Sequence, residues 1–171
     1  MSGLTAWELL HSRPCPVWLS NCLSCQVLRF GCKALDSLLG GGLRPGITEI
    51  AGEAGSGKSQ FGLQLLLQVQ LPVGLGGLDG AAFFLSTEGE FPVKRLQQME
   101  EGVKRRLSWT KDFNFFDNVY VHQADSLEEQ HEILFTKLSW LMQQKNIRLI
   151  VIDSIAALYR AEYGEEDTVK R

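Results

Sequence analysis

The residues best suited to chemistry lie together in one glycine-rich segment of the chain. They match the pattern G-x-x-x-x-G-K-S in full: Gly52, Glu53, Ala54, Gly55, Ser56, Gly57, Lys58 and Ser59. Glycines in such a loop let successive backbone N–H groups point inward at phosphate oxygens, and a helix that follows adds the positive end of its dipole. The pattern directs the Lys58 ammonium to the β- and γ-phosphates and the Ser59 hydroxyl to Mg²⁺. It therefore predicts a site for a nucleoside triphosphate with magnesium.

A carboxylate that could complete the magnesium site follows an apolar run much later in the chain. Asp153 comes directly after residues 149–152, which are apolar at every position, as in a parallel strand covered on both faces. The carboxyl end of such a strand is where an open α/β sheet presents its ligand-binding edge. Asp153 there would hold Mg²⁺ through water, or it would instead cap the helix-like stretch 154–158.

Two further carboxylates, Glu88 and Glu90, follow the apolar run 82–86. A carboxylate at the end of this second strand would polarise the water that attacks the γ-phosphate. The spacing does not choose between Glu88 and Glu90, and a solvated acidic loop is an equal alternative for either one.

The elements that must position these residues alternate between strand and helix, which indicates an α/β fold. Short apolar runs predict strands at residues 47–51, 82–86, 119–122 and 149–152. Helical periodicity predicts helices at residues 34–39, 58–70, 92–107 and 126–144, the last opened by the capping box Ser126 and Glu129. The helix 58–70 is apolar over most of its circumference and should be buried on several sides.

The composition is that of an ordinary globular domain. The chain has 171 residues, of which 44% are hydrophobic and 22% charged, and its net charge is −3. A slightly acidic chain does not bind nucleic acid by bulk electrostatics, so any DNA contact should be local or supplied by a partner. No apolar run reaches the ~18 residues of a membrane span, and Pro14 and Pro16 interrupt the mildly apolar start, so we expect an intracellular protein.

Two other features have a structural and a functional interpretation. The cysteines at positions 15, 22, 25 and 32 contain a central C-x2-C, but their outer spacing favours unligated, reduced thiols over a zinc site. The run Lys104-Arg105-Arg106 at a helix end suits the helix dipole better than it suits a nucleic-acid patch.

Several motifs, in this order, resemble the RecA-type recombinases of homologous recombination, in their eukaryotic and archaeal branch and most of all their recombinase paralogues. They lie at residues 38–43, 47–53, 56–60, 86–89 and 151–154. Residues 77–80, 91–92 and 94–98 carry the likeness to the paralogues, and the similarity covers about residues 31–163. The resemblance implies a P-loop NTPase with a RecA-like, mostly parallel sheet and helices on both faces. Residues 1–30 contain two prolines and no sustained period, so we expect an irregular N-terminal arm there, and the resemblance makes residues 31–171 a partial ATPase core.

The resemblance also implies roles for individual residues. It makes ATP the nucleotide, with Mg²⁺ held by Ser59 and Asp153. It also makes Glu88, rather than Glu90, the catalytic glutamate, with Lys58 as the second catalytic residue. Gln60 joins the phosphate loop in the nucleotide-binding set. Arg95 matches an arginine that stacks on adenine, which suits a planar guanidinium.

The implied function is that of an ATP-binding recombinase paralogue in the repair of DNA double-strand breaks and crosslinks. It would act in the nucleus, with some protein in the cytoplasm, in complexes with other paralogues and with the recombinase itself. Single-stranded or branched DNA would be contacted through the complex, and no membrane is involved. The family's sensor strand and DNA loops have no counterpart after Asp153, so the core is expected to be incomplete and poorly stable alone, unless a partner rescues it. The alternative is a non-enzymatic interaction module that binds a paralogue without turning over ATP.

Overall fold

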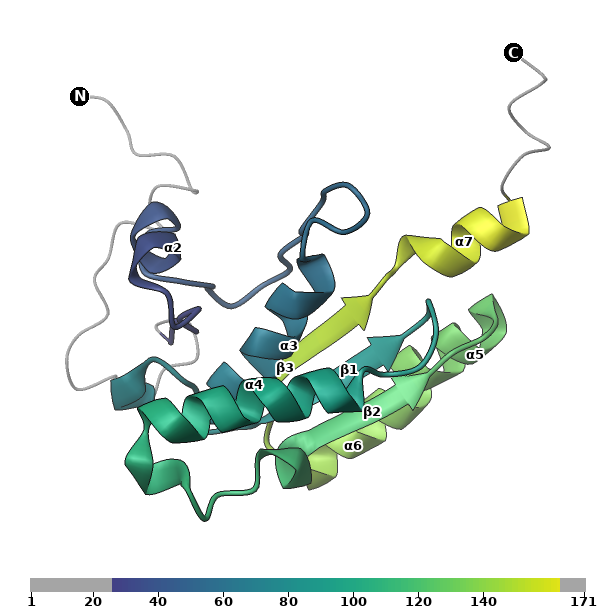
Figure 1. Cartoon of the computed structure of the whole chain (residues 1–171). Coiled ribbons are helices and arrows are strands. Elements are labelled where there is room, and N and C mark those ends of the chain that lie inside the picture. The colour runs from purple at the N-terminus through teal and green to yellow at the C-terminus, as the bar shows by residue number, and fades with distance from the viewer. Residues whose placement is uncertain (1–25, 164–171) are drawn as a thin grey trace, which may run out of the picture.

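The computed structural model describes residues 26–163, and these form a three-stranded sheet with helices on both of its faces (Figure 1). The strands are β1 (Ala81–Ser86), β2 (Val119–Gln123) and β3 (Ile147–Asp153). They are parallel and lie in the order β2-β1-β3. Ser86 pairs with Gln123 on one side and with Asp153 on the other, so the three strands end level at one edge of the sheet.

Helices precede the first strand, connect the strands and follow the last one, and those up to residue 144 lie where their periodicity predicted them. They are α2 (Lys33–Leu38), α3 (Lys58–Gln68), α4 (Val93–Arg106), α5 (Leu127–Glu132), α6 (Leu138–Gln144) and α7 (Ala156–Tyr163). A π-helical turn, Ile133–Lys137, makes α5 and α6 one continuous element. Short 3-10 turns occur at Val73–Leu75, Ser108–Thr110 and Phe115–Asn118.

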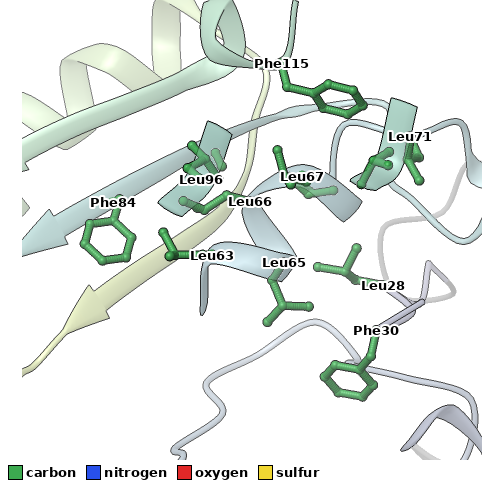
Figure 2. Packing of buried hydrophobic residues seen from close by; sticks show 13 residues of the cluster. Leu28, Phe30, Leu63, Leu65, Leu66, Leu67, Leu71, Phe84, Leu96 and Phe115 are labelled. Atoms are coloured by element: carbon green, nitrogen blue, oxygen red, sulfur yellow. The ribbon is translucent and has the colours of Figure 1, made fainter. Parts of the chain in front are cut away.

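Helix α3 lies at the centre of the larger core cluster (Figure 2). Its leucines at positions 63, 66 and 67 are fully buried, as the apolar girth of this segment predicted. Gly62 permits the close packing of α3 on β3, because a Cβ at this position would lie 3.2 Å from a methyl group of Val151. Leu96 and Val103 of α4 join the same cluster, so α3 and α4 cover one face of the sheet.

The opposite face of the sheet is covered by the α5–α6 element. Phe83 and Leu85 of β1 pack there against Ile133 and Leu138, with Ala124 from the loop after β2. Successive residues of a strand point to opposite faces, which is why the fully buried β1 supplies both clusters. The predicted α/β fold with helices on both faces of a parallel sheet is confirmed.

The start of α5 shows how local chemistry sets an element boundary. The Glu129 N–H donates a hydrogen bond to Ser126 Oγ at 3.2 Å, which is the first half of the predicted capping box. The Glu129 carboxylate accepts from the N–H of Asp125, at 3.0 Å, rather than from that of Ser126. The helix therefore begins after Ser126, as predicted.

The strand predicted at residues 47–51 is wrong. The segment is irregular, with Ile47 fully exposed and Ile50 44% exposed. An apolar run becomes a strand only when a neighbouring strand takes up its backbone hydrogen bonds, and within residues 26–163 the sheet contains only β1, β2 and β3. Strand β3, which was expected to be covered on both faces, is only half-buried, with Ile150 40% exposed.

The packed core begins before residue 31. The sequence predicted that residues 1–30 form an irregular arm outside it. Leu28 forms an isolated antiparallel bridge with Leu43, and both Leu28 and Phe30 are buried. The Phe30 ring lies 4.8 Å from that of Phe61 in α3. The end of the predicted arm thus belongs to the core, because the apolar side chains at 28 and 30 pack against residues distant in sequence.

Within residues 26–163, no helix has both the length and the apolar character needed to cross a membrane.

Candidate nucleotide-binding site

The phosphate loop, residues 52–59, precedes α3 and adopts a backbone that its glycines permit. Gly55 has φ +78° and Gly57 has φ +97°, in the left-handed region that L side chains rarely adopt. Gly57 is also the N-cap of α3, so the loop leads directly to the end of the helix where backbone N–H groups lack intrahelical partners. Such an end attracts anions, and α3 is long enough, at 11 residues, to contribute its dipole.

Lys58 brings a positive charge back over this loop. Its Nζ atom donates hydrogen bonds to the carbonyl oxygens of Gly52 and Glu53, each at 2.8 Å. Gly52 lies close to Ser56, since a Cβ at Gly52 would come within 2.9 Å of Ser56 Oγ. An ammonium group and the N–H groups of a helix terminus are the donors that a triphosphate needs, so this donor set fits the predicted nucleotide.

The two predicted magnesium ligands come from elements that pack against each other. Ser59 is exposed in the first turn of α3, and Asp153 is the half-buried last residue of β3. Figure 1 shows the loop before α3 on the side of the molecule to which the arrowhead of β3 points. A hydroxyl and a carboxylate oxygen are hard donors of the kind that Mg²⁺ binds, with water completing its shell.

Glu88 and Glu90, which the spacing could not separate, have different surroundings. Glu88 Oε1 accepts hydrogen bonds from Ser154 Oγ at 2.7 Å and from Arg160 Nη2 at 3.1 Å. Glu90 is exposed and forms no ion pair within residues 26–163. Of the two carboxylates, only Glu88 is tied to the segment that follows Asp153.

The loop after β1 and the turn after β3 are joined by several further bonds. The Thr87 N–H donates to the Asp153 carbonyl at 3.1 Å, and the Ser154 N–H donates to Thr87 Oγ1 at 2.9 Å. Thr87 Oγ1 in turn donates to the Ser154 carbonyl at 2.5 Å. Two segments 67 residues apart therefore form one connected structure at the level edge of the sheet.

Arg95, the predicted adenine-stacking residue, lies in the first turn of α4. Its Nε donates a hydrogen bond to Gln60 Oε1, and its Nη1 donates to Gln98 Oε1 at 3.1 Å. Gln60 directly follows Ser59, so this contact joins the exposed Arg95 side chain of α4 to the first turn of α3, which carries the predicted magnesium ligand.

Sequence reasoning did not single out Arg160, and used Ser154 only as part of a family motif. The sequence held only a weak signal for Arg160. It lies six residues after Ser154, in a helix-like stretch that follows the carboxyl end of the strand ending at Asp153. At the end of the same helix, the charge of the Glu162 carboxylate and a hydrogen bond to it raise the pKa of the Tyr163 hydroxyl.

The remaining sequence candidates lie apart from this edge or outside the described residues. Cys15, Cys22 and Cys25 fall outside residues 26–163, and Cys32 is an exposed free thiol. Lys104 of the basic run forms an ion pair with Glu100 at 3.0 Å, one turn earlier in α4. In the part of the chain that the structure describes, no cluster of three or more His, Cys, Asp and Glu side chains could hold a metal ion.

Comparison with known proteins supports the same assignment of family. The family model described as Rad51 matches residues 23–170. DNA repair protein rhp57 of Schizosaccharomyces pombe is 43% identical over 143 residues, which is 80% of this chain and 40% of that protein. DNA repair protein XRCC3 of Mus musculus is 39% identical over 145 residues, covering 81% of this chain and 41% of that protein.

An archaeal protein is similar to the same extent. DNA repair and recombination protein RadA of Aeropyrum pernix is 40% identical over 144 residues, 82% of this chain and 43% of that protein. The chain thus spans about two fifths of the length of the curated relatives it matches. The family match over most of the chain, with which the parallel sheet is consistent, shows that this chain belongs to the Rad51 family.

Proposed function

We propose that this chain binds ATP with Mg²⁺ at residues 52–59 and acts in recombinational DNA repair. The observation that carries the proposal is the conformation of the loop: two left-handed glycines lead into the N-terminus of α3, with the Lys58 ammonium folded over the loop. Bound ATP would supply the phosphoryl group that is transferred to water. The chain's own residues would hold the phosphates and orient the reacting water.

Each residue has a distinct part in this proposal. Lys58 and the loop N–H groups neutralise phosphate charge, which is the main contribution that a protein makes to phosphoryl transfer. Ser59 and Asp153 hold Mg²⁺, and Arg95 stacks its guanidinium plane on the adenine ring. Glu88 accepts a hydrogen bond from the attacking water and so aligns it with the γ-phosphate.

The biological role follows from the relatives. The matched proteins are named for DNA repair, and one also for recombination. We therefore place this chain in the nucleus, with some in the cytoplasm, in complexes with other recombinase paralogues and the recombinase itself. Such complexes, rather than this acidic chain alone, would bind single-stranded or branched DNA in the repair of double-strand breaks and crosslinks.

A second candidate function is a module that binds a paralogue without hydrolysing ATP. It is favoured by the apolar side chains that the sheet leaves uncovered, Ile47 in the irregular segment and Ile150 in the edge strand β3. Unpaired strand edges with exposed apolar residues are common sites of association.

Binding of a fluorescent ATP analogue to the full chain tests the first proposal. We expect Lys58→Ala to weaken binding by about tenfold or more, because a hydrogen bond to a charged group contributes ~1.5–3 kcal/mol. The matched control is Lys111→Ala, which removes an exposed lysine away from the loop and should leave binding unchanged. Equal binding by the wild type and Lys58→Ala would contradict the proposal.

The same variant separates the two candidate functions. If Lys58→Ala abolishes both nucleotide binding and the assembly of paralogue complexes, nucleotide governs assembly. If the complexes form with unchanged affinity while nucleotide binding is lost, the interaction module is the better account.

A further inference from the structure

Helix α7 follows the site directly but is weakly anchored to the rest of the molecule. None of its residues is buried, and Leu158 is its one side chain that packs against the second core cluster. Ile155, Tyr159 and Tyr163 recur every four residues, and all three are exposed. Figure 1 shows α7 extending away from the arrowhead of β3. A helix with so little buried surface depends on its few specific contacts for its position.

One of these contacts reaches the proposed catalytic carboxylate. Arg160 Nη2 lies 3.1 Å from Glu88 Oε1, and the two residues are 72 positions apart. Ser154 Oγ donates to the same oxygen at 2.7 Å. Within residues 26–163 no hydrogen bond to Oε2 is formed, so the second oxygen is available to a water molecule.

The two donors on Oε1 determine how the carboxylate is turned. A single hydrogen bond allows a glutamate side chain to rotate about its terminal torsion, which is broad. A second donor that approaches from α7 restricts this rotation and keeps Oε2 in one direction. The ion pair itself is exposed, with the two side chains 68% and 53% accessible, so its contribution to stability is small and its consequence is geometric.

We propose that Arg160 is a positioning residue for Glu88, through which the placement of α7 is coupled to the phosphate site. The inference rests on the proposed function, in which Glu88 orients the attacking water. A partner that binds α7 and moves Arg160 away would break one of the two hydrogen bonds to Glu88 Oε1. Glu88 would then be held by Ser154 alone.

Hydrogen exchange of residues 156–163 tests the coupling without nucleotide. We expect Glu88→Gln and Arg160→Gln each to speed exchange of α7 by about two- to fivefold, the range that an exposed ion pair produces. The double variant should be no faster than either single variant, because both remove the same interaction. Glu90→Gln, which changes a nearby carboxylate without an ion pair, is the control and should leave exchange unchanged. Additive effects, or an α7 that Glu88→Gln does not affect, would overturn the coupling.

ATP hydrolysis by the full chain, assembled with its partner where the chain requires one, tests the positioning role. Arg160→Gln should lower kcat by about tenfold with KM for ATP unchanged, less than the ~100-fold expected for a 1 Å misplacement of a reacting group. Arg160→Lys should recover part of the rate, and Arg106→Gln on α4 is the control. An unchanged kcat in Arg160→Gln overturns the positioning role. A wild type that binds no ATP instead contradicts the proposed function, and the exchange experiment still decides whether Arg160 holds Glu88.

Discussion

Ser86 pairs directly with Asp153 in the register of β1 and β3, so the two strands end at the same level. The loop that carries Glu88 and the turn that carries Ser154 therefore leave the sheet side by side. Their hydrogen bonds, including that of the Thr87 N–H to the Asp153 carbonyl at 3.1 Å, follow from this register. The relationship places a proposed magnesium ligand and a proposed catalytic carboxylate at one edge.

The role of Asp153 predicts a change in magnesium dependence. Wild-type chain should bind an ATP analogue more weakly in EDTA than in Mg²⁺, because Mg²⁺ offsets the charge of the phosphates. Asp153→Asn should reduce this difference, since the amide carries no charge to hold the ion. Titration of the analogue in the two buffers measures it. Asp125→Asn, at an exposed position in the loop after β2, is the control. An unchanged difference in Asp153→Asn would exclude Asp153 as a ligand.

The loop glycine Gly57 should resist substitution for a conformational reason. At φ +97° a Cβ would meet no atom within 4 Å, so the cost is backbone strain and not collision. We expect Gly57→Ala to lower the free energy of unfolding in urea by about 1–2 kcal/mol.

The matched control is Gly102→Ala within α4, which also has open space around its Cβ but does not require positive φ. Alanine in a helix interior is favoured over glycine by ~0.5–1 kcal/mol, so this variant should gain stability. Equal effects of the two alanines would show that the left-handed conformation at Gly57 carries no cost.

The capping hydrogen bond of Ser126 predicts a measurable loss of stability. Ser126→Ala removes the acceptor for the Glu129 N–H and should cost about 1 kcal/mol. Ser139→Ala changes a serine within α6, whose hydroxyl donates to the Phe135 carbonyl and satisfies no helix terminus. This control should be close to neutral in the same urea unfolding experiment. A neutral Ser126→Ala would mean that α5 does not depend on its cap.

The uncovered apolar residues predict weak cooperativity for the isolated chain. Ile47 is fully exposed and Ile150, in the edge strand, is 40% exposed. Folding therefore removes less apolar surface from water than in a domain whose apolar residues are all covered. The urea m-value scales with the surface exposed on unfolding, and we expect it to fall near or below the lower end of the usual ~1–3 kcal/mol/M. Addition of a paralogue partner should raise both the midpoint and the m-value. A cooperative monomer with an m-value normal for 171 residues would contradict this prediction.

The pattern of residues was sufficient for those parts of the fold that rest on local interactions. Helix α3 was recognisable from its apolar periodicity, and its start from the loop glycines that precede it. Strands β1, β2 and β3 were recognisable as short apolar runs, with ends that shifted by only one or two residues. These features depend on neighbours in sequence, which is why one sequence reveals them.

Other features depended on partners far along the chain. Residues 47–51 have the composition of a strand, yet they remain irregular because no strand of the described sheet pairs with them. Leu28 and Phe30 looked like part of an irregular arm, but Leu43 and Phe61 bring them into the core.

The candidate site divides along the same line. The sequence by itself determined the phosphate loop, because glycine, lysine and serine at that spacing supply the required backbone freedom, charge and hydroxyl within eight consecutive residues. The tertiary structure alone decided that Glu88, and not Glu90, contacts Ser154 and Arg160. That distinction depends on the parallel register of β1 and β3, which brings together side chains 66 and 72 residues apart.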